Sequence, residues 1–114
     1  RTTITRLAAL ALAGAFLAGT TAYAADDVKT LWDKQCAKCH GKDGKGKTTM
    51  GKKLKCKDYT DPKVQAKLKD DEMIKLTNEG KKEGSKTLMK PYKGKLTDKQ
   101  IKDLVALIRK FKKE

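Results

Sequence analysis

The feature that constrains this chain most is the pentapeptide Cys36-Ala37-Lys38-Cys39-His40. Two thiols with this spacing near the end of a helix lie along one edge of a porphyrin, where both can add to its vinyl groups as thioethers. The imidazole that follows then projects beneath the ring toward the iron. Cys-x-x-Cys-His is the attachment signature of c-type haem. The motif therefore predicts one covalent haem c held by Cys36 and Cys39, with His40 as an iron ligand.

Two other chemistries could use the same residues. A redox-active Cys-x-x-Cys pair is expected near a βαβ pattern, and the chain shows none. A structural zinc site could combine this motif with the distant Cys56 as a Cys₃His set. However, the adjacent Cys39 and His40 make an awkward tetrahedral pair, and no second Cys-x-x-Cys or His-x-x-His is present. Haem is favoured, and zinc is the alternative.

His40 is the only histidine in the sequence. The sixth position of the iron must therefore hold a methionine, a weaker ligand or nothing. A thioether suits low-spin haem iron and raises its potential. Met50 lies only ten residues beyond His40, too close to reach the opposite face, and Met73 lies in an expected helix whose pattern is typical of a core. Met89 lies in a short apolar island within a lysine-rich loop, and we predict it as the sixth ligand.

The N-terminus has the order of a secretory signal. Arg1 and Arg6 precede nineteen uncharged residues, 7–25, and Ala22-Tyr23-Ala24 places small residues at the positions of a cleavage site. We expect residues 1–24 to be a signal peptide, residues 25–114 to be the mature domain, and the protein to be exported to the periplasm. An uncleaved membrane anchor is the alternative, because a span needs about 17–25 residues.

Cleavage would leave 90 residues and lower the formal net charge from +14 to +12, because it removes Arg1 and Arg6. A chain of this length buries a modest core and usually needs a disulfide, a metal or a cofactor. Its 25 lysines indicate acidic partners and electrostatically steered encounter. Lysine predominance without interleaved aromatic residues argues against nucleic acid. Contact with an anionic membrane surface would be transient.

The hydrophobic pattern predicts helices and no strands, so the expected class is all-α. A first helix is expected from a cap at Asp26 or Asp27 to about His40, followed by a loop as far as Tyr59. Two short helices should follow, one from Asp61-Pro62 and one from Asp70 or Asp71 that stops at Gly80, and then a second loop over residues 81–92. The strongest prediction is a final helix with a capping box at Thr97 and Gln100 and an apolar face. That face comprises Ile101, Leu104, Val105, Ile108 and Phe111.

Along nearly its whole mature length the chain resembles class I (monohaem) c-type cytochromes. Trp32 stands four residues before Cys36, where that family usually has an aromatic residue. The attachment motif lies near the mature N-terminus, whereas cytochromes of the c-prime type carry it near the C-terminus. Gly51-Lys52-Lys53-Leu54 has the spacing of the family's Gly-Pro-x-Leu. There the proline carbonyl accepts a hydrogen bond from the ligand imidazole, and the carbonyl of Lys52 is expected to do so here.

Met89 with Pro91-Tyr92 resembles the family's ligand loop, and residues 104–108 resemble its C-terminal helix. Leu107 and Val28 stand where the family often has an aromatic residue and a glycine. The contact between the terminal helices is therefore expected to be either looser or repacked, with Phe111 as the candidate for repacking. The resemblance implies the class I cytochrome c fold, with N- and C-terminal helices packed together around one covalent haem. It also implies a soluble single-electron carrier with His/Met ligation of the iron, and not an enzyme.

The lysines that flank the motif and the ligand loop are expected to surround an exposed haem edge and to bind acidic redox partner proteins. They are Lys38, Lys86, Lys90 and Lys93. A small haem enzyme subunit, or a haem-based ligand sensor with a labile sixth position, is the alternative function. Tyr59 and Tyr92 could hydrogen-bond the haem propionates or simply pack. Cys56 is expected to be a small buried residue, with a reactive thiol or an intermolecular disulfide as alternatives.

Overall fold

Six short helices and one hairpin make up the part of the chain that the computed structural model describes, which is Gly14 and residues 25–114. The helices are α1 (Ala25–Gln35), α2 (Ala37–His40), α3 (Thr49–Leu54), α4 (Pro62–Lys67), α5 (Asp70–Glu79) and α6 (Asp98–Lys110). Strands β1 (Lys81–Glu83) and β2 (Lys86–Met89) pair antiparallel between α5 and α6. The predicted signal peptide, Gly14 apart, lies outside the described residues. Within them, no helix is long and apolar enough to cross a membrane.

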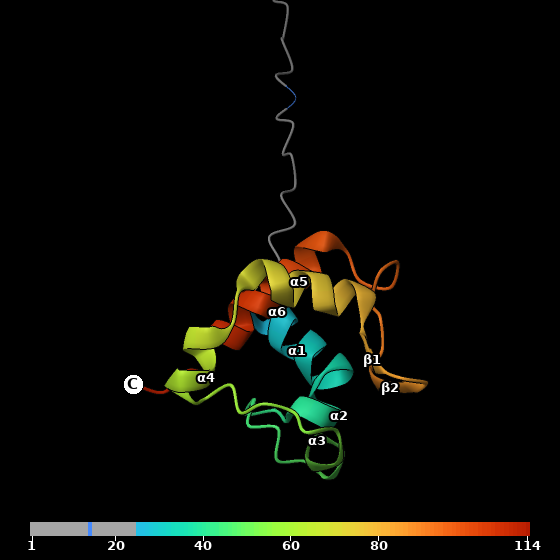
Figure 1. The fold of residues 1–114 in the computed structure, drawn as a ribbon. Coiled ribbons are helices and arrows are strands. Elements are labelled where there is room, and N and C mark those ends of the chain that lie inside the picture. Colours follow the sequence, from blue (N-terminus) through green and yellow to red (C-terminus); the bar gives the residue numbers. More distant parts are fainter. Residues whose placement is uncertain (1–13, 15–24) are drawn as a thin grey trace, which may run out of the picture.

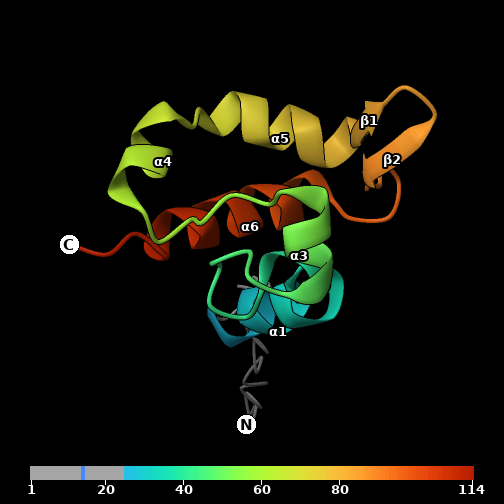
Figure 2. The same cartoon turned by 60° about the horizontal axis from the view of Figure 1, so that its bottom comes forward.

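Helix α6 forms the centre of the core, as its sequence predicts. The Thr97 hydroxyl accepts a hydrogen bond from the Gln100 backbone N–H, and the Gln100 side chain accepts one from the Thr97 backbone N–H, so the capping box is confirmed. The helix packs against α1 on one side and α5 on the other (Figures 1 and 2). The buried core includes Trp32, Met73, Ile101, Leu104, Val105 and Ile108.

Of the two outcomes expected for the crossing of α1 and α6, the structure shows repacking through Phe111. Val28, Leu107 and Phe111 lie half-buried against the core. The ring centroid of Phe111 is 5.1 Å from that of Trp32. Phe111 also covers Gly44, where a Cβ atom would collide with the ring. The aromatic ring at the end of α6 therefore fills space at this crossing and closes the loop after α2 over the core.

The first expected loop contains a helix that the pattern did not predict. Helix α3 has only six residues, of which Gly51 alone is buried, so no apolar period marks it in the sequence. Its start is set by Thr48, whose hydroxyl accepts a hydrogen bond from the Gly51 backbone N–H. The helix expected over residues 27–40 is also divided, because α1 ends at Gln35 and α2 begins at Ala37.

The second expected loop contains the β1–β2 hairpin, which projects from the helical body (Figures 1 and 2). Residues 81–87 are all exposed, so the strands have no buried face and no alternating pattern to reveal them. The hairpin is too small to change the helical class. The predicted start of α4 is confirmed, because Asp61 caps it ahead of Pro62. Helix α5 stops at Gly80 as expected, but its N-cap is Lys69 rather than Asp70 or Asp71.

Candidate functional site

The two thiols and the imidazole of the motif are brought together by a break between α1 and α2. Cys36 lies in the break, and its carbonyl accepts hydrogen bonds from the backbone N–H groups of Cys39 and His40, at N···O distances of 3.2 and 3.0 Å. Gly41 ends α2 with a φ of 80°, a conformation that favours glycine. Neither cysteine forms a disulfide in the described part of the chain. Burial, with a smaller contribution from Cys39, raises the pKa of the Cys36 thiol to about 12, so this thiol is neutral at ordinary pH.

The imidazole of His40 lies among aromatic rings. Its centroid is 5.4 Å from that of Tyr59, with the two planes 21° apart, and 5.7 Å from that of Trp32. Burial lowers the pKa of His40, so its ring is held in the neutral form that can bind a metal. Its Nδ1 atom is buried and has no hydrogen-bond partner in the described part of the chain. A neutral imidazole with an unpaired ring nitrogen is suited to a metal site, where one nitrogen binds the metal and the other can hydrogen-bond.

The hydrogen bond expected between His40 and the carbonyl of Lys52 is not formed. That carbonyl instead accepts from the backbone N–H of Lys55 at the end of α3, at 3.4 Å. Lys55 ends the helix in the left-handed conformation, with a φ of 56°. The carbonyl is therefore engaged in closing α3, and the His40 ring is oriented by its aromatic neighbours.

Helix α3 is held against the motif through its first turn. The Thr48 hydroxyl donates to the carbonyl of Cys39 at 2.7 Å and accepts from the backbone N–H of Gly51 at 2.8 Å. A Cβ atom on Gly51 would overlap the carbonyl oxygens of Cys39 and Gly46. The approach of the two backbones therefore requires glycine at this position. On the other side of the motif, Trp32 donates from Nε1 to the carbonyl of Gly41 at 2.9 Å.

Met89 lies at the end of β2, half-buried, in a segment that runs beside the motif. The hydroxyl of Tyr92 donates to the carbonyl of Gln35 at 2.8 Å, next to the first cysteine. Lys90 is near enough to Cys36 to oppose the rise in that thiol's pKa. The structure thus brings the Met89 segment and the attachment motif to the same part of the molecule.

The strand pairing beside Met89 is irregular. Lys81 pairs with Met89 but Lys82 pairs with Thr87, so Leu88 is an extra residue in β2. A bulge of this kind re-aims the neighbouring side chains, and Leu88 and Met89 are both half-buried although the rest of the hairpin is exposed. Gly80 packs closely beneath the backbone of Met89, where a Cβ atom would collide with its carbonyl oxygen.

The remaining candidates take less central places. Met73 is buried in the core, as predicted, and Met50 is half-buried on α3. The Tyr92 hydroxyl is engaged with Gln35, which favours a packing role for this residue. Cys56 is a half-buried free thiol whose pKa is raised by burial and by nearby Cys39. No group of three His, Cys, Asp or Glu side chains in the described residues could hold a metal ion, so the zinc alternative has no geometric support.

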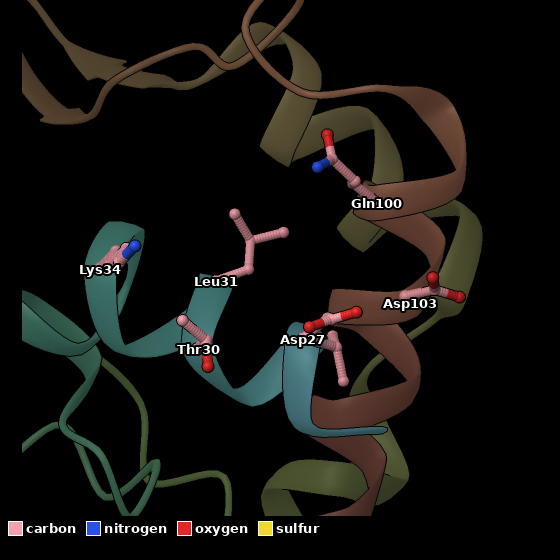
Figure 3. Close-up of a pocket in the computed structure, with 7 residues that line it drawn as sticks. Asp27, Thr30, Leu31, Lys34, Gln100 and Asp103 are labelled. Atoms are coloured by element: carbon pink, nitrogen blue, oxygen red, sulfur yellow. The ribbon is translucent and has the colours of Figure 1, made fainter. Parts of the chain in front are cut away.

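The open grooves of the surface do not mark this site. A groove of about 360 Å³ lies between α1 and α6, lined by Asp27, Thr30, Leu31 and Lys34 from α1 and by Gln100 and Asp103 from α6 (Figure 3). Another of about 320 Å³ lies beside Gly41 and Thr48. Neither includes the two motif cysteines or Met89. The donor set itself fits a covalently bound haem c: two cysteines outside any disulfide, followed by a neutral imidazole whose Nδ1 has no partner in the described residues.

Two residues near the site were missed by sequence reasoning. Gln65 is buried, and Arg109 donates hydrogen bonds to it and to the chain around it. The one available signal was compositional, since Arg109 is the only arginine after Arg6 in a chain with 25 lysines. A single arginine among so many lysines indicates a position where several hydrogen-bond donors in one plane are needed.

Comparison with known proteins agrees with this geometry. The sequence model of the family described as cytochrome c matches residues 25–112. Among solved structures, the chain is similar to the KustC0563 c-type cytochrome, with 38% identity, a TM-score of 0.64, and coverage of 75% of this chain and 96% of that one. It is similar in the same way to a tyrosine-to-phenylalanine mutant of Kustc0563, with 37% identity, a TM-score of 0.63, and coverage of 75% and 99%.

A comparison with curated protein sequences found no match. The family match spans the described domain almost from end to end, and the helical architecture is that of the class I cytochrome c fold. Covalently bound haem c with its iron is the cofactor of that family. The chain therefore belongs to the cytochrome c family and is a haem-binding electron-transfer protein.

Proposed function

We propose that this protein is a soluble single-electron carrier with one haem c, whose iron is ligated by His40 and Met89. The observation that carries the proposal is the state of His40, a buried imidazole held neutral, whose Nδ1 has no hydrogen-bond partner in the described residues, directly after two cysteines that form no disulfide. The bound haem iron supplies the one-electron change between its ferric and ferrous states. The polypeptide must attach the haem, supply ligands to its iron and exclude water from it.

Each of these tasks has residues suited to it. Cys36 and Cys39 would form the thioethers by addition of each S–H bond across a vinyl group. Trp32 and Tyr59 pack against the His40 imidazole and limit its movement and its contact with water. His40 is the only histidine, so the chain has no second imidazole to act as an acid or base on a bound substrate. A carrier is therefore favoured over a haem enzyme subunit or a ligand sensor.

The ligand set is tested by absorption spectra of the exported holoprotein in both oxidation states. A six-coordinate, low-spin spectrum is expected. Met89→Ala should shift the ferric spectrum toward high spin, lower the reduction potential and let small ligands bind, because an alanine side chain offers no donor. Met50→Ala and Met73→Ala are the matched controls and should leave the coordination unchanged. A five-coordinate, high-spin spectrum of the unsubstituted protein would favour the enzyme or sensor instead.

Covalent attachment is tested by extraction into acidified acetone. The colour should remain with the protein, because two thioethers hold the group. Loss of either Cys36 or Cys39 should weaken retention, and loss of both should abolish it. Exported protein that contains zinc and no haem would contradict the proposal.

We also propose export to the periplasm and docking to acidic redox partners. The support is the signal-like N-terminus and the net charge of +14. Lys38, Lys86, Lys90 and Lys93 are all exposed, and Lys90 lies near Cys36. The mass of the exported protein is expected to correspond to a chain that starts at Ala25, whereas retention of residues 1–24 would indicate the membrane-anchored alternative.

A further inference from the structure

Gln65 is the one polar side chain that the described residues bury, with 4% of its surface exposed. Its amide Nε2 donates to the carbonyl of Tyr59 at 2.7 Å and to the carbonyl of Ile108 at 2.8 Å. Its Oε1 accepts from Nη1 of Arg109 at 3.0 Å. A buried amide is stable only when its hydrogen bonds are satisfied, and these three bonds satisfy it. Gln65 therefore links α4, α6 and the segment that carries Tyr59.

Arg109 completes this linkage from α6. Its Nη1 also donates to the Gln65 carbonyl at 2.8 Å, and its Nη2 donates to the Leu68 carbonyl at 2.7 Å. Its Nε bonds Asp70 at the start of α5, at 2.8 Å. One guanidinium thus meets four acceptors on two neighbouring elements. A lysine ammonium is a single point charge and cannot reach such a divided set. We call Gln65 and Arg109 together the clamp.

The clamp acts on a residue that touches the site. The backbone of Tyr59 is held on both sides, since its N–H donates to the Gly44 carbonyl at 2.9 Å and its carbonyl accepts from Gln65. Its ring stacks on the imidazole of His40. Burial, with smaller effects of nearby Cys56 and Cys36, raises the pKa of Tyr59 to about 12, in keeping with a ring kept away from water.

We propose that Gln65 and Arg109 are positioning residues of the redox centre, which hold the Tyr59 ring on the imidazole of His40 and keep water from that side of the ligand. This inference rests on the proposed ligation of iron by His40. Water near a redox centre stabilises its more highly charged, oxidised state, and solvent exposure is one of the factors that set haem potentials. A loosened Tyr59 ring should therefore lower the reduction potential.

The test is potentiometric titration of the holoprotein. Arg109→Lys keeps the charge but loses the divided set of hydrogen bonds, and it should lower the potential. Asp70→Asn is the matched control, because it removes only the negative charge of the exposed partner of the same guanidinium, and it should leave the potential unchanged. Gln65→Met, of similar size and without an amide, provides a second variant in case the first does not fold.

Measuring the same clamp variants in a Tyr59→Leu background distinguishes an effect on the redox centre through Tyr59 from a purely structural role. If the clamp acts through the Tyr59 ring, Arg109→Lys should cause no further change of potential once that ring is absent. The paramagnetically shifted proton resonances of the His40 ring should move in Arg109→Lys and Gln65→Met but not in Asp70→Asn.

Two outcomes would overturn the inference, and they are distinguishable. Clamp variants that unfold more easily but keep the potential and the His40 resonances would show that the clamp only stabilises the fold. An equal shift of potential in the Tyr59→Leu background would show that it does not act through Tyr59. An unsubstituted protein whose iron lacks histidine ligation would instead overturn the proposed function on which the inference rests.

Discussion

Replacing Gly51 with alanine should destabilise this protein, although the same change stabilises most helices. Gly51 lies inside α3 and has an ordinary helical backbone, so helix propensity alone predicts a gain of about 0.5–1 kcal/mol. The tertiary structure predicts the opposite sign. A Cβ atom there would overlap the carbonyl oxygens of Cys39 and Gly46, and both are backbone atoms that cannot rotate aside.

The size of the effect follows from what must move. Overpacking of this kind costs about 1–3 kcal/mol. Moving α3 away from α2 also breaks the hydrogen bond from the Thr48 hydroxyl to Cys39, which adds about 0.5–1.5 kcal/mol. After subtraction of the helix gain, the free energy of unfolding should fall by about 2 kcal/mol, and each kcal/mol lowers Tm by about 4–8 °C in a domain of this size.

The assay is urea unfolding of the holoprotein, followed by far-ultraviolet circular dichroism and by haem absorbance. Lys53→Ala is the control, because Lys53 is exposed on the same helix and its replacement should change stability by no more than about 0.5 kcal/mol. The ferric spectrum of Gly51→Ala should also change, since Cys39 and His40 lie beside the displaced helix. A Gly51→Ala protein as stable as the parent would refute the close approach of α3 and α2.

Three further predictions concern other parts of the molecule. Thr97→Ala should lower the free energy of unfolding by about 1 kcal/mol, as measured by thermal melts, because the capping box is lost. Thr97→Ser should keep most of the parent protein's stability in the same measurement. Phe111→Ala should lower the free energy of unfolding by no more than about 3 kcal/mol, the low end of the range for loss of a phenylalanine ring, because this ring is only half-buried over Trp32 and Gly44. A decrease of less than about 0.5 kcal/mol in urea unfolding would contradict this packing. The second-order rate of electron exchange with the physiological partner should fall as ionic strength rises, because salt shortens the Debye length to about 10 Å at 0.1 M. Stopped-flow measurements should show slower exchange after charge reversal at Lys38, Lys86, Lys90 or Lys93. Reversal at Lys112 or Lys113, at the far end of the chain, should slow it less. Equal effects at the two groups would mean that docking is not directed to the haem edge.

Much of the fold and the centre of the site could be predicted from local sequence. The attachment motif spans five consecutive residues, so its chemistry does not depend on distant parts of the chain. The capping box at Thr97 and the Asp61-Pro62 start of α4 are equally local, because caps bond within the first turn. Helix α6 was predictable because an apolar face repeats along 13 residues.

Features without a periodic pattern could not be predicted this way. Helix α3 buries only a glycine, and the exposed hairpin has no apolar face, so neither differs from a loop in sequence. The bulge at Leu88 depends on the pairing register with β1, which the composition of β2 does not specify. The sequence also does not show which donor the Lys52 carbonyl will meet. In the structure it accepts a hydrogen bond at the end of α3, and it does not bond His40.

By itself, the sequence determined the cofactor chemistry, the helical class and the basic character, because each depends on residue types or on their spacing along the chain. The tertiary structure alone decided what surrounds His40. Trp32 and Tyr59 lie 8 residues before it and 19 after it, and they meet its ring only when the chain folds. The Gln65–Arg109 bonds cross 44 residues. Contacts between residues so far apart leave no local pattern, since the chain-entropy cost of bringing them together is met by the packing of the whole core.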